Sequence, residues 1–542
     1  MVKAAAFPGP AWAVDGLIID FNDCADGQAF DADVCIIGSG AAGLTLANEL
    51  DGHACSILML EGGGQGHEAD SHSLFDATVL GPPHGGIHGG RARVFGGTTT
   101  LWQGQALRLD AQDLESRAWV PHSGWPISAL DLEPFYARAE QQLLLGLDLT
   151  YERLCSLGGV TPAAFDSTRV TVSCSRWMSQ PNFATQHGSA VARSRQLTVL
   201  LHANATEILL HEGGATVDAV TFASLSGRKG LARAKVFVLC AGGIENPRLL
   251  LASGQGRPAG IGNAYDLVGR YYHDTLYAEF GSLGVINRRR LNDLFQLFYR
   301  DGIKHGPKVV PSVDHTTAAG TLKAQAEVVF VGDPDSPAAA ASQLVNAVLR
   351  RPKPVRATVP HPLRRLLRSP VETARLAYRV YVKHRVGTPA NGAVALGGQC
   401  EMPPRPESRV TIGRDRDRIG VPRAELHWSL GDLERATLAD LHNVVASELS
   451  RLRLAARPVD LPASSWPEQV ADGYHHMGTT RMSDSERSGV VDRNCRVHGV
   501  SNLFVGGSSV FPTGGRSSPT LTIVALCIRL ADHLKASALR HV

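Results

Sequence analysis

Metal-binding and disulfide patterns are missing from this sequence of 542 residues. Its nine cysteines, scattered from Cys24 to Cys527, form no CxxC or CxxCH pattern, which argues against iron–sulfur, zinc and covalently attached haem sites. An odd number of cysteines dispersed along the chain is typical of a protein from a reducing compartment. The first thirty residues carry several Asp and no continuous apolar core, and no window approaches twenty apolar residues. We therefore expect a cytoplasmic protein with no secretory signal and no membrane span.

Strong net charge is also missing. The formal charge of +3 and the lack of a basic stripe interleaved with aromatics argue against nucleic acid as a partner. The composition, 44% hydrophobic and 19% charged, is ordinary for a soluble globular enzyme, and the length allows two domains with sizeable cores.

One stretch concentrates basic residues. Residues 350–385 hold eleven Lys or Arg against one acid, Glu372, interleaved with Leu and Val. Such a stretch suits weak contact with an anionic surface or partner. It also suits a solvated basic helix pair whose charge is balanced elsewhere on the fold. Both readings stay open.

A strand, a glycine-rich turn, a helix and a second strand follow one another early in the chain. The run Asp33–Ile37 is apolar, Gly38, Gly40 and Gly43 stand at GxGxxG spacing, and helical periodicity follows. In this arrangement the glycines make a tight turn, admit a pyrophosphate to backbone N–H groups and let helix and strand pack closely. Glu61 ends the second strand eighteen residues after Gly43, where a carboxylate can bind the hydroxyls of an adenosine ribose.

The acid at this position favours FAD or NAD over NADP. Because no second fingerprint follows for a separate nicotinamide site, FAD is the better prediction. A second glycine-dense region, residues 85–102, joins Gly96-Gly97 to three threonines, which suits a flat ring or a phosphate, although a plain surface loop has the same composition.

Further patterns indicate the domain organisation. We expect paired strands at 197–210 and 217–225, a helix from Asp131, and a buried strand Val236–Cys240 that runs into a glycine turn and a helix. These patterns predict an α/β protein of two domains. Residues 31–110, 196–275 and 465–542 form a discontinuous, Rossmann-like FAD-binding domain, 111–195 a connecting or cap segment, and 276–464 a substrate-binding domain with an antiparallel sheet and helices.

The densest chemistry lies near the C-terminus, in residues 474–482 (Tyr-His-His-Met-Gly-Thr-Thr-Arg-Met) and in Ser518-Pro519-Thr520-Leu521-Thr522, which opens a final helix. Paired histidines are usually structural or ligate a metal. Since no carboxylate or cysteine cluster in the sequence completes a metal site, we expect no metal and a histidine general base.

Taken together, the glycine fingerprint, the Gly96-Gly97-Thr98 loop, the Ala241-Gly242-Gly243 turn and the HxxGT pattern at His475 resemble the glucose–methanol–choline (GMC) family of FAD-dependent oxidoreductases. The sugar-oxidising branch, with pyranose oxidases and glycoside 3-oxidases, is the most similar. The resemblance implies hydride transfer from an alcohol carbon to flavin N5, with His475 as the base. The acceptor would be O2 or a soluble or quinone acceptor.

Two positions depart from the family pattern. The second catalytic residue of the family, His or Asn, falls at Ser518, whose hydroxyl can hold a substrate oxygen but cannot carry imidazolium charge. Leu101 stands where pyranose oxidases with covalent flavin have a histidine, so the FAD should be non-covalent.

The sequence therefore predicts oxidation of an alcohol group on a sugar, glycoside, aminoglycoside-like or polyol substrate. A redox-neutral, lyase-like activity or a purely structural flavin is the alternative that Ser518 keeps open. The candidate catalytic residues are His475, Ser518 and His476, and the candidate substrate-binding residues are Gln399 and Glu401, for which a surface role is equally open. The candidate cofactor-binding residues are Gly38, Gly40, Gly43, Glu61, Gly62, Arg91, Gly97, Thr98, Ala205, Gly507, Ser508 and Thr520.

Overall fold

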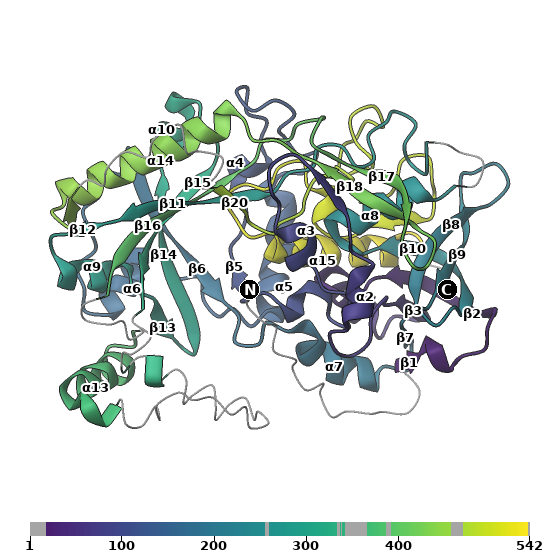
Figure 1. The fold of residues 1–542 in the computed structure, drawn as a ribbon, viewed down its shortest axis with the longest axis horizontal. Coiled ribbons are helices and arrows are strands. Elements are labelled where there is room, and N and C mark those ends of the chain that lie inside the picture. Colours follow the sequence, from purple (N-terminus) through teal and green to yellow (C-terminus); the bar gives the residue numbers. More distant parts are fainter. Residues whose placement is uncertain are drawn as a thin grey trace.

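Two eight-stranded sheets lie side by side in the computed structural model (Figure 1). The structure describes residues 18–254, 259–332, 337, 339–341, 366–385, 392–456 and 470–539. The first sheet contains the glycine fingerprint, for which the sequence predicts FAD, and it is called the FAD-binding half below. The second has one polar face and one apolar face, and a long helix covers the apolar face.

The first sheet has the strand order β1-β7-β3-β2-β10-β9-β8, with β21 paired to β10. Its strands are β1 (Ile18–Asp20), β2 (Gln28–Ile37), β3 (Ile57–Leu60), β7 (Leu197–Leu201), β8 (Asn204–Leu210), β9 (Val217–Ala223), β10 (Lys229–Leu239) and β21 (Leu503–Val505). All pairs are parallel except those of β9 with β8 and β10. The expected strand 197–210 is two strands, broken where His202 takes a positive φ, and only β8 pairs with β9.

Helices cover this sheet and complete the Rossmann-like half. They include α1 (Ala41–Leu50), α5 (Ala129–Gln142), α8 (Gly242–Ala252) and α15 (Thr520–Ala536), and α15 packs on both α1 and α5. The helix expected from Asp131 begins three residues earlier, because Ser128 is its N-cap and Asp131 closes a capping box.

The second sheet has the order β20-β11-β16-β15-β14-β6-β5, with β13 paired to β14. Its strands are β5 (Gln105–Ala106), β6 (Val170–Trp177), β11 (Thr275–Ser282), β13 (Phe298–Arg300), β14 (Ile303–Pro311), β15 (Ala324–Phe330), β16 (Val394–Glu401) and β20 (Val470–Asp472). The antiparallel sheet expected for the substrate-binding domain is therefore present. It also takes β5, β6 and β20 from outside residues 276–464, so the strands cross the expected domain boundaries.

The two faces of this sheet differ in polarity because neighbouring residues of a strand point to opposite sides. Leu276, Ala278 and Phe280 share one face with Leu396 and Val328, and α14 (Asp432–Arg451) covers that face. The opposite face carries Thr275, Tyr277, Glu401, Gln399, Gln325, Glu327 and Lys308. The apolar face makes the core of this half, which leaves the polar face for the site.

The remaining elements lie outside the two large sheets. A three-stranded sheet joins β17 (Arg409–Arg416) and β18 (Pro422–His427) to β4 (Thr78–Leu80). Shorter elements are α2 (Ala69–Ser73), α3 (Gly86–Gly89), α4 (Ala111–Leu114), α6 (Tyr151–Leu157), α7 (Phe183–Arg193), α9 (Arg288–Phe295), α10 (Val313–Ala319), α13 (Pro370–Ala377) and the strand pair β12 (Gly284–Val285) and β19 (Ala455–Ala456). All nine cysteines are free thiols, and among the described helices none is long and apolar enough to cross a membrane.

Candidate active site

The turn between β2 and α1 has the shape of a pyrophosphate cradle. A Cβ at Gly38 (φ +105°) would lie 2.7 Å from the Cys240 carbonyl oxygen, and one at Gly43 would lie 1.9 Å from the Gly38 carbonyl oxygen. Gly40 has open space, with nothing within 4 Å of an added Cβ. No side chain caps the N-terminus of α1, so its backbone N–H groups and positive end are free for an anion.

Glu61 stands at the carboxyl end of β3, beside this turn. Its carboxylate accepts hydrogen bonds from Ser39 N (3.1 Å), Ser39 Oγ (2.5 Å) and Gly63 N (2.9 Å). Burial raises the pKa of Glu61, and these hydrogen bonds offset part of the rise. A carboxylate offers about four lone-pair positions, so room is left for a ribose hydroxyl.

Most other cofactor candidates gather along this edge. The parallel strands β2, β3, β10 and β21 end together there, which is where open α/β sheets bind ligands. Gly62 follows β3, Gly507 and Ser508 follow β21, and Ala205 is the second residue of β8. Gly97 packs beside the cradle, since its Cβ would lie 2.8 Å from the Cα of Gly40.

Three candidates have other surroundings. Thr98 is exposed on the 3-10 turn after Gly97, and Thr520 is the first residue of α15. The guanidinium of Arg91 donates to Ile87 O, Glu245 Oε1 (2.7 Å) and Phe75 O, inside a buried ion cluster. With these donors engaged, a cofactor contact by Arg91 stays a prediction.

His475 is held by Thr275, the first residue of β11, and by Asp274, which precedes it. Its backbone N donates to Asp274 Oδ1 (2.8 Å), and its ring Nδ1 lies 2.7 Å from Thr275 Oγ1. No described residue bonds its Nε2. Burial lowers the pKa of His475, and the negative charge of Asp274 opposes that change. A neutral imidazole with a bare Nε2 is what a general base requires.

The segment after His475 makes close contacts with two other parts of the chain, at Tyr271 and at Gly243. Gly478 has φ +86°, and a Cβ there would lie 2.2 Å from Tyr271 O. Thr479 Oγ1 donates to Gly243 O (2.6 Å), in the turn that follows β10. Only glycine tolerates the first approach, and the threonine fastens the histidine loop to the FAD-binding half.

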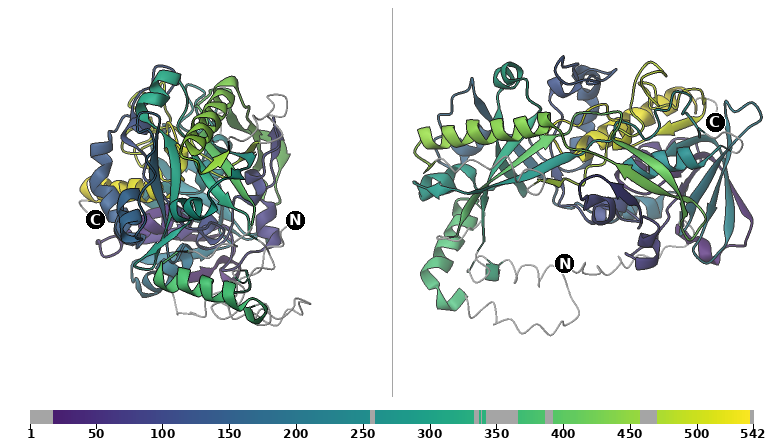
Figure 2. Two further views of the ribbon diagram at one scale, coloured as in Figure 1. Left: turned by 90° about the vertical axis from the view of Figure 1, so that its left-hand side faces the viewer. Right: turned by 45° about the horizontal axis from the view of Figure 1, so that its top comes forward.

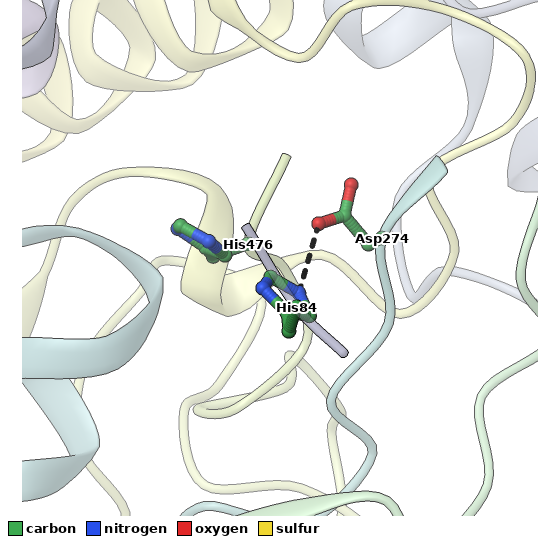
Figure 3. Close-up of side chains that lie close together, drawn as sticks. All are labelled: His84, Asp274 and His476. Atoms are coloured by element: carbon green, nitrogen blue, oxygen red, sulfur yellow. Dashed lines mark ion pairs between the residues drawn. The ribbon is translucent and has the colours of Figure 1, made fainter. Parts of the chain in front are cut away.

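His476 faces elsewhere, among His84, Tyr272 and α3. Its ring lies 5.6 Å from that of His84 (Figure 3) and 6.2 Å from that of Tyr272, and no described residue is a hydrogen-bond partner of its Nε2. Burial lowers the pKa of His476 to about 3. The two histidines thus point to different neighbours, as expected for adjacent residues of an extended segment.

A carboxylate does lie beside these histidines, contrary to the sequence reading. Potential ligand atoms of His84, Asp274 and His476 lie within 4.8 Å of one another. Ile87 N donates to His84 Nδ1 (3.1 Å), and His84 Nε2 lies 2.7 Å from Tyr272 OH and 3.5 Å from Asp274 Oδ2. Protein partners therefore engage both ring nitrogens of His84, and we interpret the cluster as a hydrogen-bond network.

Asp274 is the anion at the centre of this network. Burial would raise the pKa of Asp274, but the hydrogen bond with His84 and the nearby histidines outweigh burial and lower it to about 2. The ionised carboxylate accepts from Thr275 N and His475 N. It therefore fixes the backbone of the histidine loop and supplies negative charge beside it.

Ser518 lies in the loop before α15, and no described residue bonds its hydroxyl, which is partly exposed. Two residues earlier, buried Arg516 donates from Nη1 to Gln325 Oε1 (2.9 Å). Gln325 Nε2 in turn donates to Gln399 Oε1 (2.7 Å), and Gln399 Nε2 has no hydrogen-bond partner in the part of the chain that the structure describes. The Ser518 loop therefore faces the polar side of the second sheet, the side that Thr275 shares.

The two substrate candidates are both buried, so the surface role is wrong for each. Glu401 accepts from Arg117 Nη1 and Nη2 and from Lys323 N. Burial would raise the pKa of Glu401, but Arg117 outweighs it and the pKa is lowered. Gln399 has a free amide donor on the polar face, whereas the oxygens of Glu401 are taken by protein groups.

The sequence reading missed Asp274, Thr275, His84, Gln325 and Arg516. Each is joined to its partner across a long chain separation, such as the 200 positions between Thr275 and His475. Arg516 alone carried a local signal, because it stands two residues before Ser518.

Comparison with known proteins identifies the class. GMC oxidoreductase family models match residues 35–270 and 404–527. The chain belongs to the GMC oxidoreductase family, which confirms the resemblance seen in the sequence. It is an enzyme whose family relatives include oxidases and dehydrogenases of alcohol substrates, and FAD is the cofactor this membership implies.

Individual relatives are distant. The fructose dehydrogenase large subunit of Gluconobacter japonicus is 22% identical over 590 residues, covering 93% of this chain and 98% of the relative. A C-glycoside 3-oxidase of Microbacterium trichothecenolyticum is 26% identical over 340 residues, 61% of this chain and 52% of the relative. An FAD-dependent oxidoreductase from Chaetomium thermophilum shares the fold, with a TM-score of 0.54 at 17% identity over 93% of this chain and 99% of that one.

Proposed function

We propose that this protein oxidises an alcohol group of a sugar, glycoside, aminoglycoside-like compound or related polyol to the carbonyl, with His475 as the base. One observation carries the proposal. His475, oriented by Thr275 and Asp274, borders the same polar sheet face as the Arg516–Gln325–Gln399 chain of hydrogen bonds. FAD, when bound, supplies the acceptor for the hydride.

Four residues of this chain have separate roles in the proposed reaction. Nε2 of His475 takes the proton of the substrate hydroxyl, and Asp274 stabilises the positive charge that develops on the ring. Thr275 keeps the ring in one orientation through Nδ1. We assign the substrate oxygen to the hydroxyl of Ser518, which no described residue bonds and which can donate a hydrogen bond.

The polar sheet face supports a substrate with several hydroxyl groups. Gln325 and Gln399 lie opposite each other in neighbouring strands, in register with Tyr277. A buried amide donor without a partner, such as Gln399 Nε2, is costly unless a ligand or water satisfies it. From strand spacings of about 4.8 Å and rises of about 3.4 Å per residue, Thr275 and Gln325 lie roughly 12 Å apart on this face, so its polar groups are spread over that distance.

We further propose that FAD is held without a covalent bond. The fit of the cradle at Gly40, the uncapped start of α1 and Glu61 supports binding through phosphates and ribose. Leu101, at the end of the 3-10 turn Gly97–Thr100, offers no nitrogen for attachment.

A redox-neutral reaction or a structural flavin is the alternative that Ser518 keeps open. Anaerobic mixing with a panel of sugars, glycosides and polyols tests the two. Bleaching of the visible flavin band by a panel member supports alcohol oxidation. An unbleached flavin with every member, in protein that dithionite does reduce, contradicts it. The electron acceptor, O2 or a soluble or quinone acceptor, and a cytoplasmic location stay predictions.

A further inference from the structure

A helical segment of the basic stretch stands away from the body of the protein. Residues 366–385, here called the basic arm, hold α13 and the π-helical turn Tyr378–Val382, and α13 projects from the two sheets (Figure 2). None of the residues in α13 or in the π-helical turn is buried. The part of the stretch before residue 366 lies outside the described residues.

The arm exposes large apolar side chains in a pattern. Leu367 is 78% exposed and Tyr381 is 79% exposed. Val371, Ala374, Tyr378 and Tyr381 follow one another at steps of three or four residues, so they form one stripe on a helical surface. An isolated exposed apolar residue needs no explanation, but a stripe of them on a projecting helix marks a contact surface.

Basic side chains border this stripe. Arg368, Arg375 and Lys383 are exposed, and no described acid pairs with any of them. Arg379 and Arg385 turn inward instead. Arg379 donates to Gln296 Oε1, and Arg385 donates to Gln296 O and Asp293 O. The guanidinium of Arg385 also stacks on the ring of Phe298. The arm is therefore anchored at its C-terminal end and presents apolar and basic side chains together.

We propose that the basic arm docks on an anionic lipid surface, with the apolar stripe entering the interface and the bases lying at the headgroups. Charge decides between this occupant and a second copy of the chain. A two-fold contact of arm with arm would bring together two segments rich in Arg and Lys, each with Glu372 as its one acid. An anionic bilayer complements the charge, and tyrosine and long basic side chains suit its interface.

Vesicle sedimentation tests the proposal on the full-length holoenzyme. Vesicles of phosphatidylcholine with phosphatidylserine should bind the protein at low salt, and vesicles of phosphatidylcholine alone should not. Raising the salt from about 0.1 M to about 1 M shortens the screening length from about 10 Å to about 3 Å, so the bound fraction should fall steeply.

Three matched variants isolate the cause. Charge reversal by Arg368→Glu, Arg375→Glu and Lys383→Glu should lower vesicle affinity by about tenfold or more. The same change of charge at exposed Arg193, Arg195 and Lys229, in the other half of the protein, should leave affinity within about twofold. Tyr378→Ser with Tyr381→Ser keeps the charge and should weaken binding through the apolar stripe alone.

Flavin content and flavin reduction by substrate should be unchanged in all of these variants, which confirms that they fold. The proposal is overturned by protein that stays in the supernatant with anionic vesicles at low salt, or by equal loss of binding in the arm and control charge variants. It is also overturned by a dimer, measured by light scattering, that the double tyrosine variant no longer forms.

Discussion

Replacing Thr275 with Val tests how the base is oriented. Valine keeps the shape of threonine but removes the hydroxyl that lies 2.7 Å from His475 Nδ1. A buried ring nitrogen left without its partner costs about 1–3 kcal/mol. If the whole cost appears in the transition state, flavin reduction slows by roughly 5- to 150-fold. Loss of the fixed ring orientation acts in the same direction.

The assay is anaerobic stopped-flow reduction of the bound FAD by a substrate from the sugar panel. Thr275→Val should lower the limiting rate and leave the apparent substrate dissociation constant within a few-fold, because Thr275 acts on the base. Thr275→Ser, which restores a hydroxyl at the same place, should recover most of the rate. A limiting rate for Thr275→Val equal to that of the wild type would exclude Thr275 as the group that orients His475, as would a serine variant as slow as the valine variant.

Three further predictions concern the proton, the substrate oxygen and the cofactor. Asp274→Asn removes the negative charge that raises the pKa of His475. The rate of flavin reduction should rise with pH around a midpoint below the ordinary histidine pKa near 6.5. In Asp274→Asn this midpoint should move to still lower pH. An unchanged or higher midpoint would contradict this. Ser518→Ala should cost about 1–3 kcal/mol in kcat/KM, whereas Ser518→Asn should be tolerated; equal activity of the alanine variant would remove Ser518 from the site. Acid precipitation should release FAD from the wild type, and flavin in the acid pellet would contradict non-covalent binding. Gly40→Leu should purify without flavin, while Gly66→Leu, also in open space, should keep it. A yellow Gly40→Leu protein would contradict a phosphate cradle at Gly40.

Local patterns were enough to predict the nucleotide-binding half. The β2–glycine–α1–β3 order depends on residues within about thirty positions. The close approach of Gly43 to the Gly38 carbonyl oxygen lies within the same unit, whereas Gly38 itself approaches the distant Cys240. The two-sheet α/β class and the family followed from motifs of the same kind. Helix starts were less secure, since Ser128 and Asp131 both can cap and the structure uses Ser128 as N-cap.

The surroundings of His475 could not be predicted in this way. Asp274 and Thr275 reach it across about two hundred positions, through the pairing of β11 with β20. The fate of Glu401 depended on Arg117, which lies 284 positions away and neutralises it. A sequence shows that an acid ends a strand, but the partner is decided by how distant segments fold together.

His475 is the proposed base of an FAD-dependent alcohol oxidation, and single-turnover flavin reduction measures that role most directly. His475→Ala and His476→Ala are compared with the wild type under anaerobic conditions, with FAD content measured for each. We predict that His475→Ala keeps its FAD and reduces it about a hundred- to ten-thousand-fold more slowly, while His476→Ala changes mainly the apparent substrate affinity. Flavin reduction by His475→Ala within a few-fold of the wild-type rate would exclude His475 as the base. So would a His476→Ala protein that is slower than His475→Ala.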